Sequence, residues 1–533
     1  MEAMIPTFNE LILDENIPFS QSRIWDYQRD YYAKQGIHAW ANKIPFYITS
    51  NPYIANSYAH IIIRFIQDCI KKNSLDPAAP FYIVEIGAGS GTFSFYLLKR
   101  LAGLKEALSV NVQLVYVMTD LIRENIDFSM AHENFQPFIA AGMLDFAHFD
   151  AEYSKEIALL RSKTILRKED NKKGKNPFVF IANYCFDSLK HDVFQVSGGS
   201  LLEGLCKLTT DAANMDKDQV VQLNQVKVSF QFQETQLPYY HHEVLNQLLQ
   251  HYKATADQQY ISFPIGPLMC IKHLLDIADN RLLLISSDKG FSKHLDIYQK
   301  EAPAPVFHDN NCFSLSVNFD AISQYFKLTG GDSFNQFTEQ ALTTSAFISG
   351  FTFADMQETA LALETSLNSF GHSTINNLFL NASFTANLLN IEAILPFLGA
   401  IRWDPRVFNS CRDVIINQIR NGYARTSDIE DLKEKMPVIE EHFYMLPKTP
   451  DTFFDIGVFF QEIQHYERAL EYYEKSIRHF GEKDITLYNM GLCHYHLNQP
   501  AAAVESFSAA LQQNPTYIMA RGWIAQIAAE SAQ

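Results

Sequence analysis

A short stretch of the chain combines three glycines with an acid in a spacing that could bind a small ligand. It reads FYIVEIGAGSGTFSFYLLKR from Phe81 to Arg100. The run Phe81–Ile86 is apolar and rich in β-branched residues, which is typical of a strand buried on both faces. Apolar residues at helical spacing follow, and glycines between a strand and a helix let backbone amide groups approach a ligand closely. We expect the ligand to be held at this turn by Gly87, Ala88, Gly89, Gly91 and Thr92.

The residues around this turn favour one ligand over its competitors. A dinucleotide fingerprint requires a third glycine at position 92, where this chain has Thr92. Glu85 ends the predicted strand, and its negative charge would repel a pyrophosphate. The same charge suits the amino group and the sulfonium of S-adenosylmethionine (SAM). The pattern therefore predicts a class I SAM-dependent methyltransferase, while a nucleotide or a turn without a ligand stays the alternative.

Three further polar residues lie where a cofactor could be bound. Asp120 closes the predicted strand VQLVYVM and could accept hydrogen bonds from two ribose hydroxyls, unless it only caps the next helix. Asp145 follows a glycine-containing turn and could accept the adenine amine, or could be a solvated loop acid. Ser50 precedes a helix, where it is either an N-cap or part of a lid over the cofactor carboxylate.

A second group of polar residues follows the predicted strand PFVFIA, in the segment NYCFDSL. The residue that ends the fourth strand lies beside the transferred methyl group in class I methyltransferases. Asn183 and Asp187 are therefore candidates for orienting the methyl acceptor, and Asp187 is the nearest candidate base. Catalysis would consist mostly of alignment, because the sulfonium already activates the methyl group.

Composition excludes several other classes of protein. The chain has 533 residues and a net charge of −17, which argues against bulk attraction to nucleic acid or to anionic lipid. Its seven cysteines are scattered, which favours free thiols in a reducing compartment over disulfides or a metal site. The first residues lack the basic segment of a signal peptide, and no apolar run is long enough to span a bilayer. We expect a cytoplasmic protein without a metal.

The order of the predicted elements indicates an α/β domain followed by a helical one. We expect a helical N-terminal cap at residues 1–78 and a Rossmann-like methyltransferase domain at 79–334. Within that domain, the basic run at 155–176 is predicted to be a flexible loop and residues 192–235 to be a β insertion. Residues 335–533 are expected to be entirely helical.

The C-terminal segment repeats itself with a period of 34 residues. This period, with small residues where helices cross, is typical of tetratricopeptide repeats (TPR), which we place at 450–517. Two units rarely suffice to bury a continuous core, so the helices of 350–450 are expected to stack beneath them. The pairs that define the period are Gly457 and Gly491, Ala469 and Ala503, Tyr473 and Phe507, and Ile477 and Leu511.

Several of these segments together resemble the MidA-type SAM-dependent methyltransferases. The similar segments are VEIGAGSGT, NYCFDSL, DVFQVSGGSLLEGLCKL and SSDKG, with YYAKQG and FYITSNPYIANSYA nearer the N-terminus. The family includes a mitochondrial assembly factor that methylates an arginine of a complex I subunit. The resemblance covers about residues 25–300, and it implies that the cofactor is bound by Glu85, Gly87, Gly89, Gly91 and Ser50 and that Asn183 and Asp187 lie at the methyl site.

The chain departs from that family at two positions. Tyr184 and Tyr53 stand where the family has glutamates that could pair with a guanidinium. A tyrosine beside the methyl group suits a less charged acceptor, which brings Tyr184 into the predicted catalytic group. We therefore expect a SAM-dependent methyltransferase that acts on a protein side chain recruited by the TPR domain, with no nucleic-acid or membrane partner. A small-molecule acceptor and a non-catalytic scaffold that binds a protein through its repeats are the alternatives.

Overall fold

The computed structural model describes residues 10–40, 47–168, 176–211, 222–292, 301–308, 312–336, 342–368, 371–372, 374–375, 377 and 390–531. The chain divides into two compact units. The first comprises Met1–Ser50 and Ile54–Thr374, and the second comprises Asn51–Tyr53 and Ile375–Gln533.

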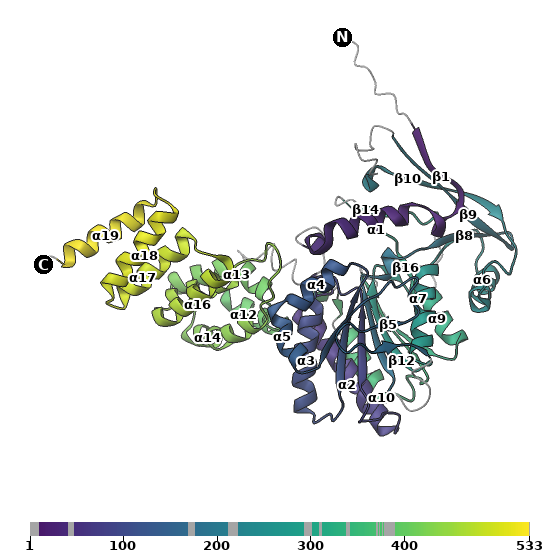
Figure 1. Cartoon of the computed structure of the whole chain (residues 1–533), viewed down its shortest axis with the longest axis horizontal. Helices are drawn as coiled ribbons and strands as arrows, with labels where there is room; N and C mark the ends of the chain where they lie inside the picture. Colours follow the sequence, from purple (N-terminus) through teal and green to yellow (C-terminus); the bar gives the residue numbers. More distant parts are fainter. Residues whose placement is uncertain are drawn as a thin grey trace, which may run out of the picture. The chain divides into compact units, whose positions relative to one another are not determined.

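A seven-stranded sheet forms the centre of the first unit (Figure 1). Its strand order is β17 (Asp332–Asn335), β18 (Thr343–Ser349), β12 (Leu282–Asp288), β7 (Phe178–Asn183), β2 (Phe81–Ile86), β3 (Leu114–Asp120) and β4 (Leu144–His148). The strands from β12 to β4 are parallel, and β18 is antiparallel to both of its neighbours. After β2 the chain adds β3 and β4 on one side and later returns to β7 on the other, so the strand order reverses between β2 and β7. Ligands of such sheets bind outside the carboxyl ends of the strands at this reversal.

Helices cover the sheet because its strands are apolar on both faces. Residues of α7 (Ile265–Ile277) and α9 (Phe319–Leu328) share one core with the strands. Figure 1 shows α3 (Thr92–Ala107) and α7 on opposite sides of the strands. The helix α2 (Pro52–Lys71) packs its Phe65 ring against Phe81 of β2.

The N-terminal segment differs from the helical cap that we expected. Residues Glu10–Pro18 form the strand β1, which pairs with β9 (Ser200–Asp211). A smaller sheet results, with the order β1, β9, β8 (Asp192–Ser197) and β11 (Gln259–Phe263), and β10 (Lys227–Glu234) also pairs with β9. Local sequence patterns did not reveal this strand because its partner lies almost 200 residues further along the chain.

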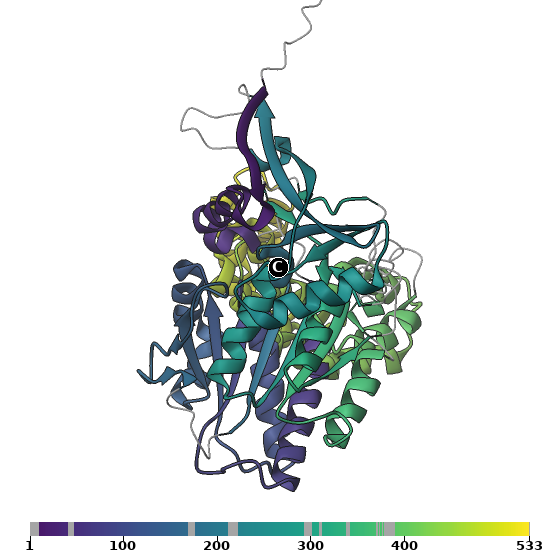
Figure 2. The same ribbon diagram turned by 90° about the vertical axis from the view of Figure 1, so that its right-hand side faces the viewer.

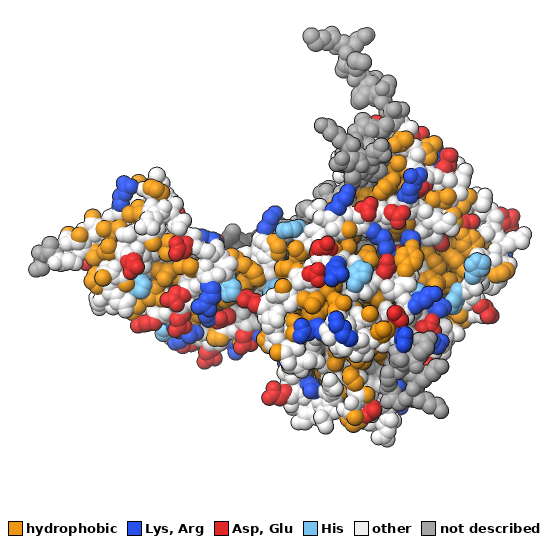
Figure 3. Space-filling model, viewed as in Figure 1, with side chains coloured by type: hydrophobic (Ala, Val, Ile, Leu, Met, Phe, Trp, Pro, Cys, Tyr) orange, Lys and Arg blue, Asp and Glu red, His pale blue; other side chains and the backbone are white. Residues whose placement is uncertain are grey.

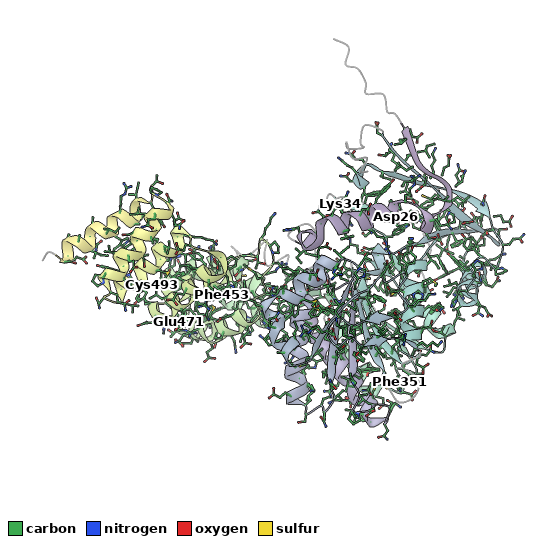
Figure 4. The ribbon with its side chains drawn as sticks, in the orientation of Figure 1. Asp26, Lys34, Phe351, Phe453, Glu471 and Cys493 are labelled. Atoms are coloured by element: carbon green, nitrogen blue, oxygen red, sulfur yellow. The ribbon has the colours of Figure 1, made fainter. Side chains whose placement is uncertain are left out.

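The helix α1 (Ile24–Gln35) follows β1, and a 3₁₀ turn, η2 (Gly36–Trp40), follows α1. Figures 1 and 2 show the strands β1 and β9 extending away from α1 toward the N-terminus. The helix has two distinct faces. Asp26 and Lys34, labelled in Figure 4, are exposed, whereas Trp25 and Gln28 are buried.

The strand β18 lies beyond residue 335, where we expected only helices. Its sequence TTSAFIS is buried at all seven positions, between β12 and β17. The serines and threonines concealed its apolar character, although their β-branched or small side chains fit a strand. The predicted flexible loop at 155–176 also contains structure, because β5 (Ile157–Ala158) pairs with β6 (Ile165–Leu166). Residues 169–175 of that loop lie outside the described residues.

The second unit is helical over its described residues and contains the 34-residue repeat. The helices before the repeat are α12 (Ile391–Ala400), α13 (Pro405–Arg420) and α14 (Thr426–Glu441). The repeat helices are α15 (Thr452–Glu462), α16 (Tyr466–Phe480), α17 (Asp484–His496) and α18 (Pro500–Gln513), followed by α19 (Ile518–Ser531). Figure 4 labels Phe453 on α15 and Cys493 on α17.

The two repeats use the same contact to pack their helices. A β-carbon built at Gly457 would lie 2.6 Å from the ring of Tyr473, and one built at Gly491 would lie 2.6 Å from the ring of Phe507. Glycine is required at both positions because each aromatic ring rests directly on the backbone of the preceding helix.

The face of the molecule drawn in Figure 3 carries acidic and basic side chains intermixed on both units. Within the part of the chain that the structure describes, helices long and apolar enough to cross a membrane are absent.

Candidate active site

The glycine turn after β2 has the conformation that its sequence predicted. Gly87, Gly89 and Gly91 have φ angles of 71°, 55° and 75°, in the left-handed region that favours glycine. The amide of Ala88 donates to the carbonyl of Thr119 (2.8 Å), which ties the turn to the end of β3. The helix α3 begins directly after the turn, at Thr92.

One oxygen of the Glu85 carboxylate is held within the core. The carboxylate accepts hydrogen bonds from the Ser94 hydroxyl of α3 and from the Tyr116 hydroxyl of β3, the latter at 2.7 Å. Burial raises the pKa of Glu85 to about 7, and these two hydrogen bonds oppose the rise. Both hydrogen bonds end on Oε2, and a contact between Glu85 and a cofactor cation stays a prediction.

Asp120, at the end of β3, points toward the turn as expected. Its Oδ2 accepts the amide of Gly89 (2.9 Å), and its Oδ1 accepts the amide of Ile122 (2.8 Å) and Nδ2 of Asn125 (3.3 Å). A carboxylate has about four acceptor positions, so Asp120 retains one, on Oδ2. The Oδ1 atom of Asn125 is buried and has no hydrogen-bond partner. Two acceptor positions for a ligand thus lie side by side at the end of β3.

A cavity of about 900 Å³, part of it open to solvent, lies at the carboxyl ends of the strands. Of the predicted site residues, Gly87, Asp120 and Tyr184 line it. Its other walls come from the segment after β3, the segment after β4, and α1 with η2. Those walls are lined by Leu121, Ile122, Asn125, Phe149, Asp150, Ala151, Glu152, Trp25, Gln28, Arg29, Tyr32 and Trp40, and further lining residues are Ile86, Cys185, Ser188 and Leu189.

Asp145, the predicted adenine contact, lies outside this cavity. Its carboxylate accepts the backbone amides of Phe146 (2.8 Å), Arg161 (2.9 Å) and Ser162 (2.9 Å), and so it fixes the turn between β5 and β6. A different acid, Asp150, lines the cavity five residues later. Asp150 is the second residue after β4, which ends at His148.

Arg29 of α1 holds the acids of this wall in place. It donates to both carboxylate oxygens of Asp150, at 2.7 and 3.0 Å, and to Glu152 at 2.9 Å. Burial raises the pKa of Asp150, but the hydrogen bonds and charge of Arg29 lower it by more than burial raises it. The pKa of Asp150 therefore lies below its usual value.

The residues after β7 form the other end of the cavity. Tyr184 has a φ of 49°, a strained conformation for an aromatic residue, and its amide donates to the carbonyl of Ser287 (2.9 Å). Asn183 accepts a hydrogen bond from the Tyr58 hydroxyl (2.9 Å), while its Nδ2 is buried without a partner. Asn183 is not among the residues that line the cavity.

Asp187 is buried behind the cavity wall and reaches it through Ser188. The Ser188 hydroxyl, which lines the cavity, donates to Oδ1 of Asp187 at 3.0 Å. Burial raises the pKa of Asp187 to about 6, and the nearby charge of Lys289 opposes the rise. A single oxygen of Asp288 accepts the amides of residues 185, 186 and 187, which fixes the turn that carries Asp187.

The remaining predicted residues do not line the cavity. Thr92 is 6% exposed and its hydroxyl pairs with that of Ser90 at 2.9 Å. Ser50 donates its amide to the carbonyl of Tyr47 (3.1 Å) and does not line the cavity. Ala88, Gly89 and Gly91 form the turn beneath the cavity rather than its surface.

The wall from α1 was not predicted, although its pattern is present in the sequence. Trp25, Gln28, Arg29 and Tyr32 fall at the i, i+3, i+4 and i+7 positions, which share one face of a helix. A helix face that combines a charge, an amide and two aromatic rings is unusual for a helix that packs only against a core. That combination is the signal that could have identified the wall.

A parallel sheet with an antiparallel strand near one edge, a glycine turn after β2 and an acid at the end of β3 define a class I SAM-dependent methyltransferase fold. Residues 62–271 match a family described as “Putative S-adenosyl-L-methionine-dependent methyltransferase”. This match confirms the resemblance to SAM-dependent methyltransferases noted from the motifs. Residues 485–517 match the tetratricopeptide repeat, which confirms the second repeat unit.

Solved structures similar to this chain include two proteins from Burkholderia thailandensis. One, described as a likely methyl transferase and bound to S-adenosyl-homocysteine, is 14% identical, with a TM-score of 0.39, and covers 63% of this chain and 88% of its own. The other is 14% identical, with a TM-score of 0.37, and covers 63% of this chain and 87% of its own. A TPR protein from Thermus thermophilus is 13% identical, with a TM-score of 0.23, and covers 33% of this chain and 91% of its own. No curated protein matches the chain.

Proposed function

We propose that this methyltransferase transfers the methyl group of SAM to a protein side chain and that its TPR helices recruit the protein that carries it. The observation that carries the proposal is the presence, in one chain, of a methyltransferase domain and a repeat of a kind that binds other proteins. The acceptor and the role of the repeats are inferences from this combination.

The cavity has the groups that the two ends of SAM require. The remaining acceptor position of Asp120 and the unpartnered Oδ1 of Asn125 can accept the two ribose hydroxyls. Phe149 and Asp150 lie on the wall beyond them, where the adenine ring would extend, and they replace Asp145 in this role. Gly87 leaves space for the part of the cofactor that links the ribose to the sulfur, because a β-carbon there would meet only Sγ of Cys185, at 3.9 Å.

The methyl acceptor would enter at the end of the cavity formed by Tyr184, Cys185 and Ser188. When bound, SAM would supply an activated methyl group. A lone pair of the acceptor forms the new bond to the methyl carbon, and the electrons of the broken carbon–sulfur bond stay on sulfur. If the acceptor is a nitrogen, Ser188 can accept its proton and pass its own to Asp187. Tyr58 fixes the orientation of Asn183, which does not line the cavity, so the proposed transfer gives Asn183 no direct contact with the acceptor.

The first experiment tests the cofactor and the acceptor together. The full chain is incubated with a cell lysate and SAM that carries a deuterated methyl group, and protein, nucleic-acid and small-molecule fractions are analysed by mass spectrometry. We expect the label on a side chain in the protein fraction. Label in the small-molecule fraction would instead establish a small-molecule acceptor. Binding of S-adenosylhomocysteine (SAH) without any labelled product would favour the scaffold.

A second experiment tests recruitment by the repeats. The Gly491→Val side chain would collide with Phe507 and disrupt the packing of α17 against α18. Gly522→Ala, in α19, is the matched control, because a β-carbon there meets nothing within 4 Å. We expect Gly491→Val to reduce labelling of the protein at least tenfold while the affinity for SAH is unchanged, and Gly522→Ala to leave both unchanged. Equal labelling by all three chains would refute recruitment by this repeat.

A further inference from the structure

The positive charge of SAM needs a partner, and the acids of the cavity already bind groups of the protein itself. Among the described residues that line the cavity, the carboxylates are those of Asp120, Asp150 and Glu152. Asp120 binds two backbone amides and Asn125, and the other two acids bind Arg29. Glu85, which the sequence suggested for this purpose, is bound to Ser94 and Tyr116 inside the core.

An aromatic ring covers the glycine turn. Trp40 ends η2, and its indole rests on the glycine turn, so that a β-carbon at Gly89 would lie 2.6 Å from Cζ2 and 2.8 Å from Cε2. Trp40, Gly87 and Tyr184 all line the cavity. The indole therefore forms part of the cavity surface directly beside the glycine turn.

The position of this ring relative to Asp120 locates it near the sulfur of a bound cofactor. The amide of Gly89, the residue beneath the indole, is 2.9 Å from Oδ2 of Asp120. In SAM the sulfur is separated from the ribose ring by a single methylene group. A ribose bound at Asp120 thus brings the sulfonium to the glycine turn and its covering indole.

We propose that the indole of Trp40 binds the sulfonium of SAM through a cation–π contact, and that this contact makes the site prefer SAM to its product SAH, in which the sulfur is a neutral thioether. The inference rests on the proposed function, because it assumes that SAM binds in this cavity. Tryptophan is the side chain with the strongest cation–π attraction, and the attraction grows when the cation is removed from water. Because SAH lacks the charge but shares the adenosine and amino-acid parts of SAM, a ring that only packs against the cofactor would affect both ligands equally.

The test compares the dissociation constants of SAM and SAH by calorimetry for the full wild-type chain and two variants. Trp40→Leu keeps an apolar side chain but removes the aromatic face, and Trp40→Phe keeps a smaller aromatic face. We expect Trp40→Leu to weaken SAM binding roughly three- to twentyfold more than SAH binding. Trp40→Phe should retain most of the preference for SAM. If Trp40→Leu changes both constants by the same factor, or changes neither, the proposal is overturned.

A second measurement avoids any change in the size of the side chain and applies even if Trp40→Leu fails to fold. The four tryptophans of the chain, of which Trp25 and Trp40 line the cavity, are replaced biosynthetically by fluorinated tryptophan, which has a less negative ring face. Trp40→Phe is labelled in the same way as the control for Trp25, and its affinity for SAM should not change with fluorination. The affinity of the wild-type chain for SAM should fall as fluorine atoms are added, while its affinity for SAH stays constant. Constant affinity of the wild-type chain for SAM across the series would overturn the proposal. Failure of the wild-type chain to bind either ligand would refute the proposed function itself, which separates the two conclusions.

Discussion

The guanidinium of Arg29 binds both carboxylate oxygens of Asp150, at 2.7 and 3.0 Å, and thereby joins α1 to the end of β4. The two residues are 121 positions apart in the sequence. Arg29 also binds Glu152, which in turn accepts the amide of Lys190 at 2.8 Å. The N-terminal helix is thus fixed to the methyltransferase sheet through the same acids that form the wall of the cavity.

Arg29→Met should destabilise the first unit and weaken cofactor binding together. The substitution leaves two partly buried carboxylates without their cation, and we expect a loss of about 2 kcal/mol in the free energy of unfolding. Arg123→Met is the matched control, because its ion pair with Asp127 is exposed and contributes less than about 0.5 kcal/mol. Urea unfolding and SAH titration measure both effects. Equal stability of the two variants would show that the Arg29 pair does not fix α1.

Gly89→Ala should weaken SAM binding beyond the effect of backbone strain. Alanine at a positive φ costs about 1–2 kcal/mol, and here its β-carbon would also displace the indole of Trp40. Gly142→Ala separates these two effects, because Gly142 has a φ of 67° and its β-carbon would meet nothing within 4 Å. Gly89→Ala should lose more stability than Gly142→Ala, because the indole must also move, and only Gly89→Ala should lose affinity for SAM in calorimetry. Unchanged affinity in Gly89→Ala would place the cofactor away from this turn.

The local elements of the methyltransferase sheet could be predicted because short-range patterns specify them. β2 spans Phe81–Ile86, the same residues that the apolar run indicated, and the left-handed glycines follow where they were expected. β1 and β18 could not be predicted in the same way. The pairing of β1 with β9 depends on contacts almost 200 residues apart, and the serines and threonines of β18 are buried only because β12 and β17 flank it.

The candidate site shows the same limit for individual side chains. The sequence indicates that Glu85 lies near the end of a strand and that Asp145 follows a glycine-containing turn, but not which way their carboxylates point. Hydroxyl groups on α3 and β3 donate hydrogen bonds to Glu85, and backbone amides of the turn between β5 and β6 donate to Asp145. The wall from α1 adds residues, such as Gln28, that only the tertiary fold brings to the cavity.

The stability of the first unit should depend on pH through Glu85. Its pKa is raised to about 7 in the folded state, so the folded chain binds this proton more tightly than the unfolded chain does. The contribution of Glu85 is therefore complete below its unfolded pKa, near 4.5, and is lost as the pH rises to about 7. Glu85→Gln should flatten the fall in melting temperature between pH 5 and 8. If the melting temperature of Glu85→Gln falls as steeply as that of the wild-type chain, other titratable groups cause the fall.

Methyl transfer to a nitrogen acceptor should also depend on pH, with the opposite sign. Asp187 can accept a proton only when ionised, and its pKa is raised to about 6, so the rate should increase from pH 5 to pH 7 and then level off. Asp187→Asn should lower the rate of deuteromethyl incorporation by about a hundredfold and abolish this increase. Ser188→Ala should have a similar effect, because the Ser188 hydroxyl is the link between Asp187 and the cavity.

The double variant of Asp187 and Ser188 tests whether the two residues act as one relay. If they do, Asp187→Asn combined with Ser188→Ala should be no slower than either single variant, because either change alone already interrupts the path of the proton. Affinity for SAH, measured at each pH, should be the same for all four chains, since neither side chain is a hydrogen-bond partner of Asp120, the proposed ribose contact. Losses that multiply in the double variant would mean that Ser188 and Asp187 act separately, and a wild-type rate in Asp187→Asn would remove Asp187 from the reaction.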